Sequence, residues 1–363
     1  MPKIAQLTTR LTKFILSLLI FCLAAGGCTN ASGMQVTLTP EASAAAPSDW
    51  YDVYFTQPTS PSAPTYRGGI DEALAEAINQ ARVSVDLAVY DLNLWSTRDA
   101  LLAAHRRGVT VRMVTESDNM DEQEVQALKE AGIEVLGDRQ EGLMHDKFVV
   151  IDRTEVWTGS MNFTTGGGYL DHNNLIRLRS TKLAEDYTYE FEQMFVEEHF
   201  STLKSSGTPN PLVTVNGSPI EVYFSPEDGT LEHILAVVNA ADESVYFMSY
   251  SFTADDLAQA LIVRAAAGVT VAGVFDKDQY HSNIGTEFDT LKTAGLDVRL
   301  DGNPRLMHHK VIIIDQQIVV TGSYNFSNNA EHINDENTLI IHNADIAAQY
   351  LAEFQRIYDA SQR

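Results

Sequence analysis

The sequence contains one motif twice, and this duplication constrains the possible fold more than any other feature. The first copy reads Leu-Met-His-Asp-Lys at residues 143–147, and the second reads Leu-Met-His-His-Lys at residues 306–310. In both copies four apolar residues and an Asp follow the Lys, and a Gly-Ser-x-Asn-Phe run begins seven residues after that Asp. Matched spacing over such a length is expected when a fold is built from two similar halves.

The spacing of the polar residues indicates a shared function for each pair. His145 and Lys147 stand two positions apart, as do His308 and Lys310. Side chains at positions i and i+2 of a strand point to the same face, so each His and Lys can reach the same space and share one phosphate. A single His-x-Lys beside an apolar run would equally suit an ordinary core strand. The second copy, with its matched spacing, favours the catalytic interpretation.

These residues resemble the signature of the phospholipase D superfamily, in which His-x-Lys-(four residues)-Asp is followed by Gly-Ser-x-Asn and occurs twice per active unit. The resemblance extends from about residue 50 to the C-terminus. It implies a phosphodiesterase that works through a phosphohistidine intermediate, with no metal ion or other cofactor. The substrate is less well defined, because fold and motif fix the chemistry of this broad family better than its substrates.

The resemblance also implies roles for the individual motif residues. His145 and His308 divide the roles of nucleophile and general acid. Lys and Asn side chains carry the donors that phosphate oxygens need, and in this chain those residues are Lys147, Lys310, Asn162 and Asn325. The other motif residues are expected to support the structure, and these are Asp152, Ser160, Asp315 and Ser323.

The two copies differ after the motifs, where the family places an acidic residue that hydrogen-bonds an active-site histidine. Glu336, in the run Asn-Asp-Glu-Asn, fits this pattern, whereas the first copy reads Asp-His-Asn-Asn at residues 171–174. Alignment of Leu175 with Leu339 puts His172 opposite Glu336. Only one of the two histidines is then expected to have a carboxylate partner of the family type.

Two consequences follow for the histidines. Asp171 remains open as a substitute acidic partner in the first copy. In relatives with two motifs the carboxylate reaches across to the histidine of the other half. By that analogy Glu336 orients His145, which makes His145 the nucleophile and His308 the general acid.

Hydrophobic periodicity predicts alternating helices and strands around both motifs. Helix faces are expected at Ile70, Leu74 and Ile78, and again at Leu231, Leu235 and Val238. Strands are expected at residues 83–90 and 245–250. A second helix in each half is expected to start with a capping box at Ser96 or Thr253 and to stop at Gly108 or Gly268.

The apolar tetrads of the motifs predict the layer structure. Residues 148–151 and 311–314 show no alternation with polar residues, which is typical of strands covered on both faces. The sequence therefore predicts an α/β protein with two similar sandwich halves, residues 49–205 and 212–363. By resemblance these halves pack about a pseudo-two-fold axis, with the active site at their interface.

The N-terminal segment has the features of an export signal. Residues 1–28 combine basic residues, the apolar run Phe14–Leu23 and small residues before Cys28, and residues 29–48 have the composition of a flexible tether. Cys22 would be removed with the signal, and Cys28 would become a lipid-modified N-terminus of a bacterial lipoprotein. Cleavage without lipid attachment is the alternative. An exported, membrane-anchored protein is the expectation.

The charge of the chain bears on its substrate. The formal net charge is −24, and removal of residues 1–28, with three basic and no acidic residues, makes it −27. Proteins that follow nucleic acid without sequence preference rely on Lys and Arg, so this balance argues against a long polyanion track. We therefore expect phospholipid head groups at a membrane surface as the substrate. An exported endonuclease and a non-catalytic surface binding protein are the alternatives. A monomer is expected to suffice, because both motifs lie in one chain.

Overall fold

The computed structural model describes residues 49–361. The signal segment and tether predicted for residues 1–48 lie outside this range. Within it, no helix combines the length and the apolar character needed to cross a bilayer.

The first half of the described chain alternates strands and helices. Its strands are β1 (Tyr51–Phe55), β2 (Ser84–Val89), β3 (Thr110–Thr115), β4 (Glu134–Gly137), β5 (Lys147–Ile151), β6 (Glu155–Gly159) and β7 (Asn174–Arg179). Its helices are α1 (Ile70–Gln80), α2 (Trp95–Arg106), α3 (Gln123–Glu130), α4 (Thr165–Tyr169) and α5 (Thr181–Phe195).

The second half repeats this order and adds one strand and one short helix. Its strands are β8 (Leu212–Val215), β9 (Ser218–Ser225), β10 (Ser244–Ser249), β11 (Thr270–Phe275), β12 (Asp297–Leu300), β13 (Lys310–Ile314), β14 (Ile318–Gly322) and β15 (Glu336–His342). Its helices are α6 (Thr230–Asn239), α7 (Asp255–Ala266), α8 (Lys277–Ser282), α9 (Phe288–Thr293), α10 (Asn328–His332) and α11 (Ala344–Ala360).

The two sheets have the same topology. The first has the order β1-β7-β6-β5-β2-β3-β4, and the second has the order β12-β11-β10-β13-β14-β15-β9-β8, which repeats it with β8 added at the edge. In the first sheet the pairs β2/β3 and β3/β4 are parallel. In the second sheet the pairs β10/β11 and β11/β12 are parallel. All other pairs in both sheets are antiparallel. The predicted fold class, two similar α/β halves, is confirmed.

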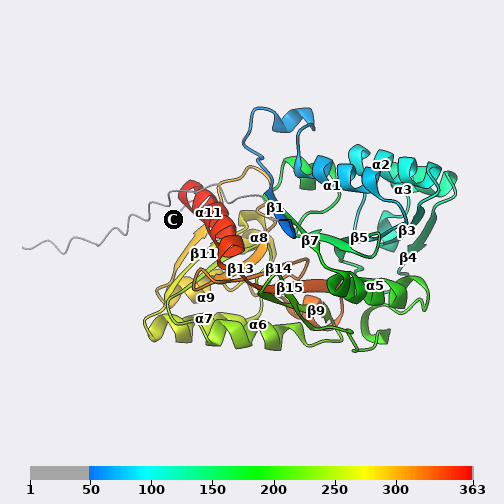
Figure 1. The fold of residues 1–363 in the computed structure, drawn as a ribbon. Helices are drawn as coiled ribbons and strands as arrows, with labels where there is room; N and C mark the ends of the chain where they lie inside the picture. The colour runs from blue at the N-terminus through cyan, green and yellow to red at the C-terminus, as the bar shows by residue number, and fades with distance from the viewer. Residues whose placement is uncertain (1–48, 362–363) are drawn as a thin grey trace, which may run out of the picture. The chain divides into compact units, whose positions relative to one another are not determined.

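Helices and sheets form layers, as Figure 1 shows: α1–α3 lie along one side of the first sheet, and α6 and α7 lie along the far side of the second. A shared core between the sheets contains side chains of both halves, together with residues of α5 and α11. Two further cores lie beneath α1–α3 and beneath α6, α7 and α9.

The motif strands β5 and β13 are buried on both faces, as their apolar tetrads predict. Phe148 and Val150 point into the shared core, and Val149 and Ile151 point into the core beneath α1–α3. In β13, residues 311–314 alternate in the same way. Each motif is thereby fixed to the central strand of a sheet, which holds the His and Lys at its start.

Two local predictions are wrong. The buried face of α6 is Thr230, Ile234 and Val238, whereas Leu231 and Leu235 are only partly buried, so the predicted face is off by one residue at two positions. The predicted capping boxes are also not formed, because α2 and α7 begin after Leu94 and Ala254, whose side chains make no capping hydrogen bond.

The Asp of each motif lies in the hairpin turn after the motif strand. Asp152 and Asp315 have φ values of 52° and 50°, in the left-handed region that Asp tolerates in tight turns. The Asp152 carboxylate accepts hydrogen bonds from the backbone N–H groups of residues 82–84 at 2.7–3.1 Å. Asp315 does the same for residues 242–244 at 2.7–2.9 Å. Each Asp ties its hairpin to the start of the neighbouring strand.

We expect Asp152→Ala to lower the free energy of unfolding by about 1–3 kcal/mol, because it removes the acceptor for three backbone donors. Asp152→Asn keeps an oxygen acceptor and the turn preference, so its loss should be smaller. Urea unfolding measures both. Below the unfolding transition the two variants should retain turnover, and a variant of normal stability without turnover would contradict the architectural role.

Candidate active site

The two halves complete each other around the motif histidines. The backbone N–H of His145 donates to the carbonyl of Asp335 at 3.0 Å, and Asp335 N–H donates to Leu143 at 2.9 Å. In reciprocal fashion, His308 N–H donates to the carbonyl of His172 at 2.9 Å. Just before each motif strand, the backbone of the histidine is therefore hydrogen-bonded to the backbone of the opposite half. This reciprocal arrangement is expected for halves related by a pseudo-two-fold axis.

The His and Lys of each motif share one buried space, as the spacing predicts. His145 and His308 are 7% and 4% exposed, and Lys147 and Lys310 are each 1% exposed. Each Lys Nζ donates to the carbonyl oxygen of its own histidine, at 2.7 Å for Lys147 and 2.9 Å for Lys310.

A tyrosine lies beside each pair. The ring centroids of Tyr90 and His145 are 5.2 Å apart, and those of Tyr250 and His308 are 4.5 Å apart. Lys147 Nζ lies 5.3 Å from the Tyr90 ring. The aromatic faces attract the ammonium groups and limit access of water to them.

The two histidines have different side-chain partners. His145 Nδ1 lies 2.8 Å from Oε2 of Glu336, in the other half. His308 Nδ1 lies 3.0 Å from the carbonyl oxygen of Ser160 and 3.0 Å from Oδ1 of Asn173. A carboxyl group therefore faces one histidine and a neutral amide faces the other.

Asn173 is the site residue that the sequence alignment missed. Leu175 pairs with Gly159, and Thr338 pairs with Gly322, so Leu175 corresponds to Thr338 and not to Leu339. The counterpart of Glu336 is consequently Asn173 and not His172. Counting from the motif would have found it, because Asn173 stands eleven positions after Asn162, as Glu336 does after Asn325.

The two residues considered as substitutes for the acidic partner lie elsewhere. Asp171 Oδ1 accepts from the backbone N–H of Leu306 at 3.3 Å and lies 3.5 Å from Nε of Arg305. His172 Nδ1 lies 3.2 Å from Nη2 of Arg356. Among residues 49–361 neither side chain hydrogen-bonds the His308 ring, and both instead contact residues of the second half at the interface.

The motif serines bind the strand segments that carry the partners of the histidines. Ser160 Oγ donates to Oδ1 of Asn173 at 2.8 Å, and Ser323 Oγ accepts from the backbone N–H of Asn337 at 3.0 Å. The glycine before each serine is needed for close approach, since a Cβ at Gly159 would lie 2.5 Å from the Asn174 carbonyl oxygen.

The motif asparagines keep their side-chain amides available. Within residues 49–361 no hydrogen bond involves the side chain of Asn162 or Asn325, and the Oδ1 atom of each is buried. Their amide groups are therefore not committed to the protein scaffold. An amide N–H₂ supplies two donors, which suits a phosphate oxygen.

Burial and mutual repulsion shift the charges of the site. Burial, together with Lys147 and Lys310, holds the pKa of His145 well below its usual value, and His308 is affected in the same direction. Burial lowers the pKa of Lys147 to about 8, and burial and the nearby Lys147 lower the pKa of Lys310 strongly. Burial raises the pKa of Glu336 to about 7. Neutral imidazoles suit nucleophilic attack. A bound anion would favour the protonated, positively charged form of the lysines.

Comparisons with known proteins agree with this architecture. The phosphatidylserine synthase of Haemophilus influenzae Rd KW20 has a similar fold, with a TM-score of 0.61 and 13% identity over 81% of this chain and 86% of that one. The family model described as "Cardiolipin synthase, PLD-like domain" matches residues 74–195 and 234–358, once in each half. The chain belongs to the phospholipase D superfamily, and it is a hydrolase of phosphodiester bonds.

Two curated relatives match part of the chain. A phospholipase D of Rickettsia prowazekii (strain Madrid E) is 30% identical over 164 residues, which cover 45% of this chain and 80% of that protein. The human mitochondrial cardiolipin hydrolase is 33% identical over 132 residues, which cover 36% of this chain and 52% of that protein. Both matches span less than half of this chain.

We expect anion binding to recharge the site lysines. The pKa of Lys147 is about 8, and that of Lys310 is lower than usual. At pH 8, therefore, part of the ligand-free protein has these lysines in the neutral form. Tungstate, which does not titrate near pH 8, should bind with uptake of roughly one proton, because an adjacent anion favours the ammonium form. Calorimetry in buffers of different ionisation enthalpy measures this uptake.

Lys310→Arg is the matched control, because a guanidinium stays charged at this pH. It should bind tungstate with a smaller proton uptake. Binding to the wild-type protein without any proton uptake would contradict the depressed lysine pKa values.

Proposed function

We propose that the protein removes head groups from phospholipids by a phospholipase D reaction that proceeds through a phosphohistidine and uses no metal ion. The observation that carries the mechanism is the contact between His145 in one half and Glu336 in the other, at 2.8 Å. This contact supports different chemical roles for the two otherwise similar histidines.

His145 acts as the nucleophile. An ionised Glu336 only accepts hydrogen bonds, so Nδ1 of His145 carries the proton and Nε2 keeps its lone pair. Nε2 attacks phosphorus, the N–P bond forms, and the bond to the head-group oxygen breaks. The resulting phosphoimidazolium is cationic, and the carboxylate of Glu336 stabilises it.

His308 acts as the general acid. The Ser160 carbonyl only accepts hydrogen bonds, so Nδ1 of His308 carries a hydrogen, and Nε2 faces the substrate side. A bound phosphodiester offsets the charges of Lys147 and Lys310, which raises the pKa of His308 toward protonation. Nε2–H then protonates the leaving oxygen. In the second step His308 takes a proton from water, whose oxygen attacks phosphorus and releases His145.

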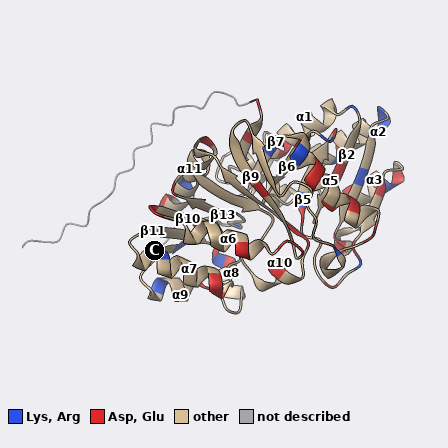
Figure 2. Ribbon diagram, turned by 60° about the horizontal axis from the view of Figure 1, so that its bottom comes forward, with Lys and Arg blue, Asp and Glu red and all other residues tan. Residues whose placement is uncertain are grey.

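Two features support a lipid over a nucleic acid as the substrate. The formal charge of −24 disfavours a polyanion, and Figure 2 shows the basic residues scattered singly among more numerous acidic ones. Two relatives are named for phospholipid cleavage, a phospholipase D and a cardiolipin hydrolase.

Location is part of the proposal. Lipid attached to Cys28 would hold the enzyme on the outer side of a bacterial membrane, beside its substrate, and the tether of residues 29–48 would give it reach. The protein acts as a monomer, because each motif is completed by the other half of the same chain.

The phosphohistidine is tested by removing only the general acid. With an activated aryl phosphodiester, whose leaving group needs no proton, His308→Asn should accumulate an acid-labile phosphoryl adduct on His145, detectable by mass spectrometry of peptides. His145→Asn should form none. An adduct on His308 in the His145→Asn variant would reverse the roles, and loss of wild-type activity in chelator, restored by a divalent ion, would refute metal independence.

The substrate is tested by offering the protein phospholipid or nucleic acid, and by offering ethanol besides water as the acceptor of the phosphoryl group. Given phosphatidylcholine vesicles and ethanol, the purified protein should form phosphatidylethanol as well as phosphatidic acid, because a small alcohol replaces water in the second step. Single-stranded DNA and RNA should be cleaved much more slowly. Rapid nucleic-acid cleavage without head-group release would favour the endonuclease, and no reaction with either would favour a binding protein.

A further inference from the structure

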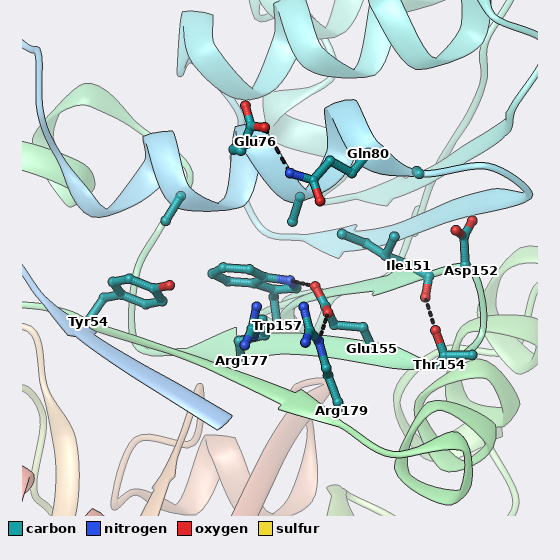
Figure 3. A pocket seen from close by; sticks show the side chains of 13 residues that line it. Tyr54, Glu76, Gln80, Ile151, Asp152, Thr154, Glu155, Trp157, Arg177 and Arg179 are labelled. Atoms are coloured by element: carbon teal, nitrogen blue, oxygen red, sulfur yellow. Dashed lines mark hydrogen bonds and ion pairs between the residues drawn. The ribbon is translucent and has the colours of Figure 1, made fainter. Parts of the chain in front are cut away.

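A pocket in the first half lies apart from the active site, between α1 and the strands β1, β6 and β7. It has a volume of about 350 Å³, and a second pocket of about 430 Å³ lies next to it. Tyr54 and Ala73 line both. In Figure 3, Tyr54 and Trp157 lie on the strand side, and Glu76 and Gln80 project from the helix opposite. No His, Lys or Asn of the motifs lines either pocket.

The internal repeat identifies the counterpart of this pocket in the second half. Tyr54 in Val-Tyr-Phe of β1 corresponds to Tyr223 in Val-Tyr-Phe of β9. The buried faces of α1 and α6 align Leu74 with Ile234. One residue earlier, Ala73 therefore corresponds to His233.

The second half fills its own position with an imidazole ring. The rings of His233 and Tyr223 are stacked, with centroids 3.7 Å apart and an angle of 11° between the planes. The Tyr223 hydroxyl donates to Glu221 at 2.7 Å, and Tyr223 is 8% exposed. A planar nitrogen heterocycle thus occupies the space between this tyrosine and its helix.

The first half has no ring at the corresponding position of its helix. Ala73 offers only a methyl group, and Tyr54 is only partly buried. Asp52, the counterpart of Glu221, forms an ion pair with Arg177. Among residues 49–361 the Tyr54 hydroxyl has no hydrogen-bond partner, so the hydroxyl and the part of the ring that Trp157 does not cover are available to a ligand.

The charges around the pocket select among ligands. Arg179 pairs with Glu155 at 2.9 Å, and Arg177 is paired as described. The Glu76 carboxylate accepts a hydrogen bond from Gln80 at 2.8 Å and pairs with no cation among the described residues. With Asp152 also in the lining, carboxylates outnumber guanidinium groups, which disfavours anionic ligands.

We propose that the space between Ala73 and Tyr54, here called the Tyr54 slot, binds a planar aromatic nitrogen heterocycle that is neutral or cationic. The ring stacks on Tyr54 where the second half places the His233 imidazole, and its N–H groups reach the Tyr54 hydroxyl and the Glu76 carboxylate. Ring stacking contributes to affinity in addition to the burial of apolar area. The volumes of the two pockets suit a small ligand.

Trp157 provides the readout, because its ring lies 5.7 Å from that of Tyr54 at an angle of 15°. The probe is benzimidazole, added to the full chain while Trp157 emission and the binding stoichiometry are followed. The wild-type protein should bind one equivalent. Ala73→His should bind about tenfold more weakly or not at all, because the new imidazole fills the slot. His233→Ala should open a second slot and bind two equivalents.

Matched controls separate the slot from general effects. Ala73→Ser leaves the slot open and should bind like the wild type, and the double variant Ala73→His, His233→Ala should bind one equivalent. Benzoate, which is anionic, and cyclohexylamine, which is not planar, should not bind. Two results would overturn the proposal. One is unchanged benzimidazole binding by folded Ala73→His, and the other is binding of only one equivalent by His233→Ala.

Discussion

The structure depends on an exchange of polar partners across the interface between the halves. Asn337 of the second half donates to Asp146 of the first at 2.9 Å, and Asn174 of the first half contacts His309 of the second at 3.0 Å. All four side chains are fully buried. A buried polar group without its partner costs about 1–3 kcal/mol, so these bonds exclude other registers of the interface. The residue before each asparagine is the one that contacts a motif histidine, so the same register sets the geometry of the site.

The exchange is symmetric in position but not in charge. Behind His145, the fully buried ammonium of Lys204 pairs with Glu190, and its Nζ lies 3.1 Å from Asp335. Behind His308, the corresponding layer contains Arg356 beside Glu353 and two further histidines. Carboxylates therefore gather on the side of His145, where the proposed reaction develops positive charge. The opposite side is close to neutral, which suits a histidine that must give up a proton.

The sequence predicted features that depend on a local pattern, such as the hydrophobic face of a strand or the spacing of a motif. It did not predict features that depend on residues distant in the sequence. The tetrad that starts at Phe148 could be predicted to be covered on both faces because no polar residue interrupts it. The cap expected from Ser96 failed because its hydroxyl donates to Asp71 of another helix, a contact that local pattern cannot show. Asn173 was missed because the alignment was anchored on an apolar residue of a strand, where a shift of one position leaves the pattern plausible. Distances across the interface needed the structure.

The single chain also explains how the two histidines came to differ. In a symmetric pair of identical subunits, every contact from one copy to the other occurs twice with the same residues. Both histidines would then face a glutamate, or both an asparagine. Encoding the halves separately frees each from the other's sequence, so that Glu336 and Asn173 could specialise. The same freedom let His233 close a gap that Ala73 leaves open. Two halves in one chain can therefore carry different residues at corresponding positions, which two identical subunits cannot do.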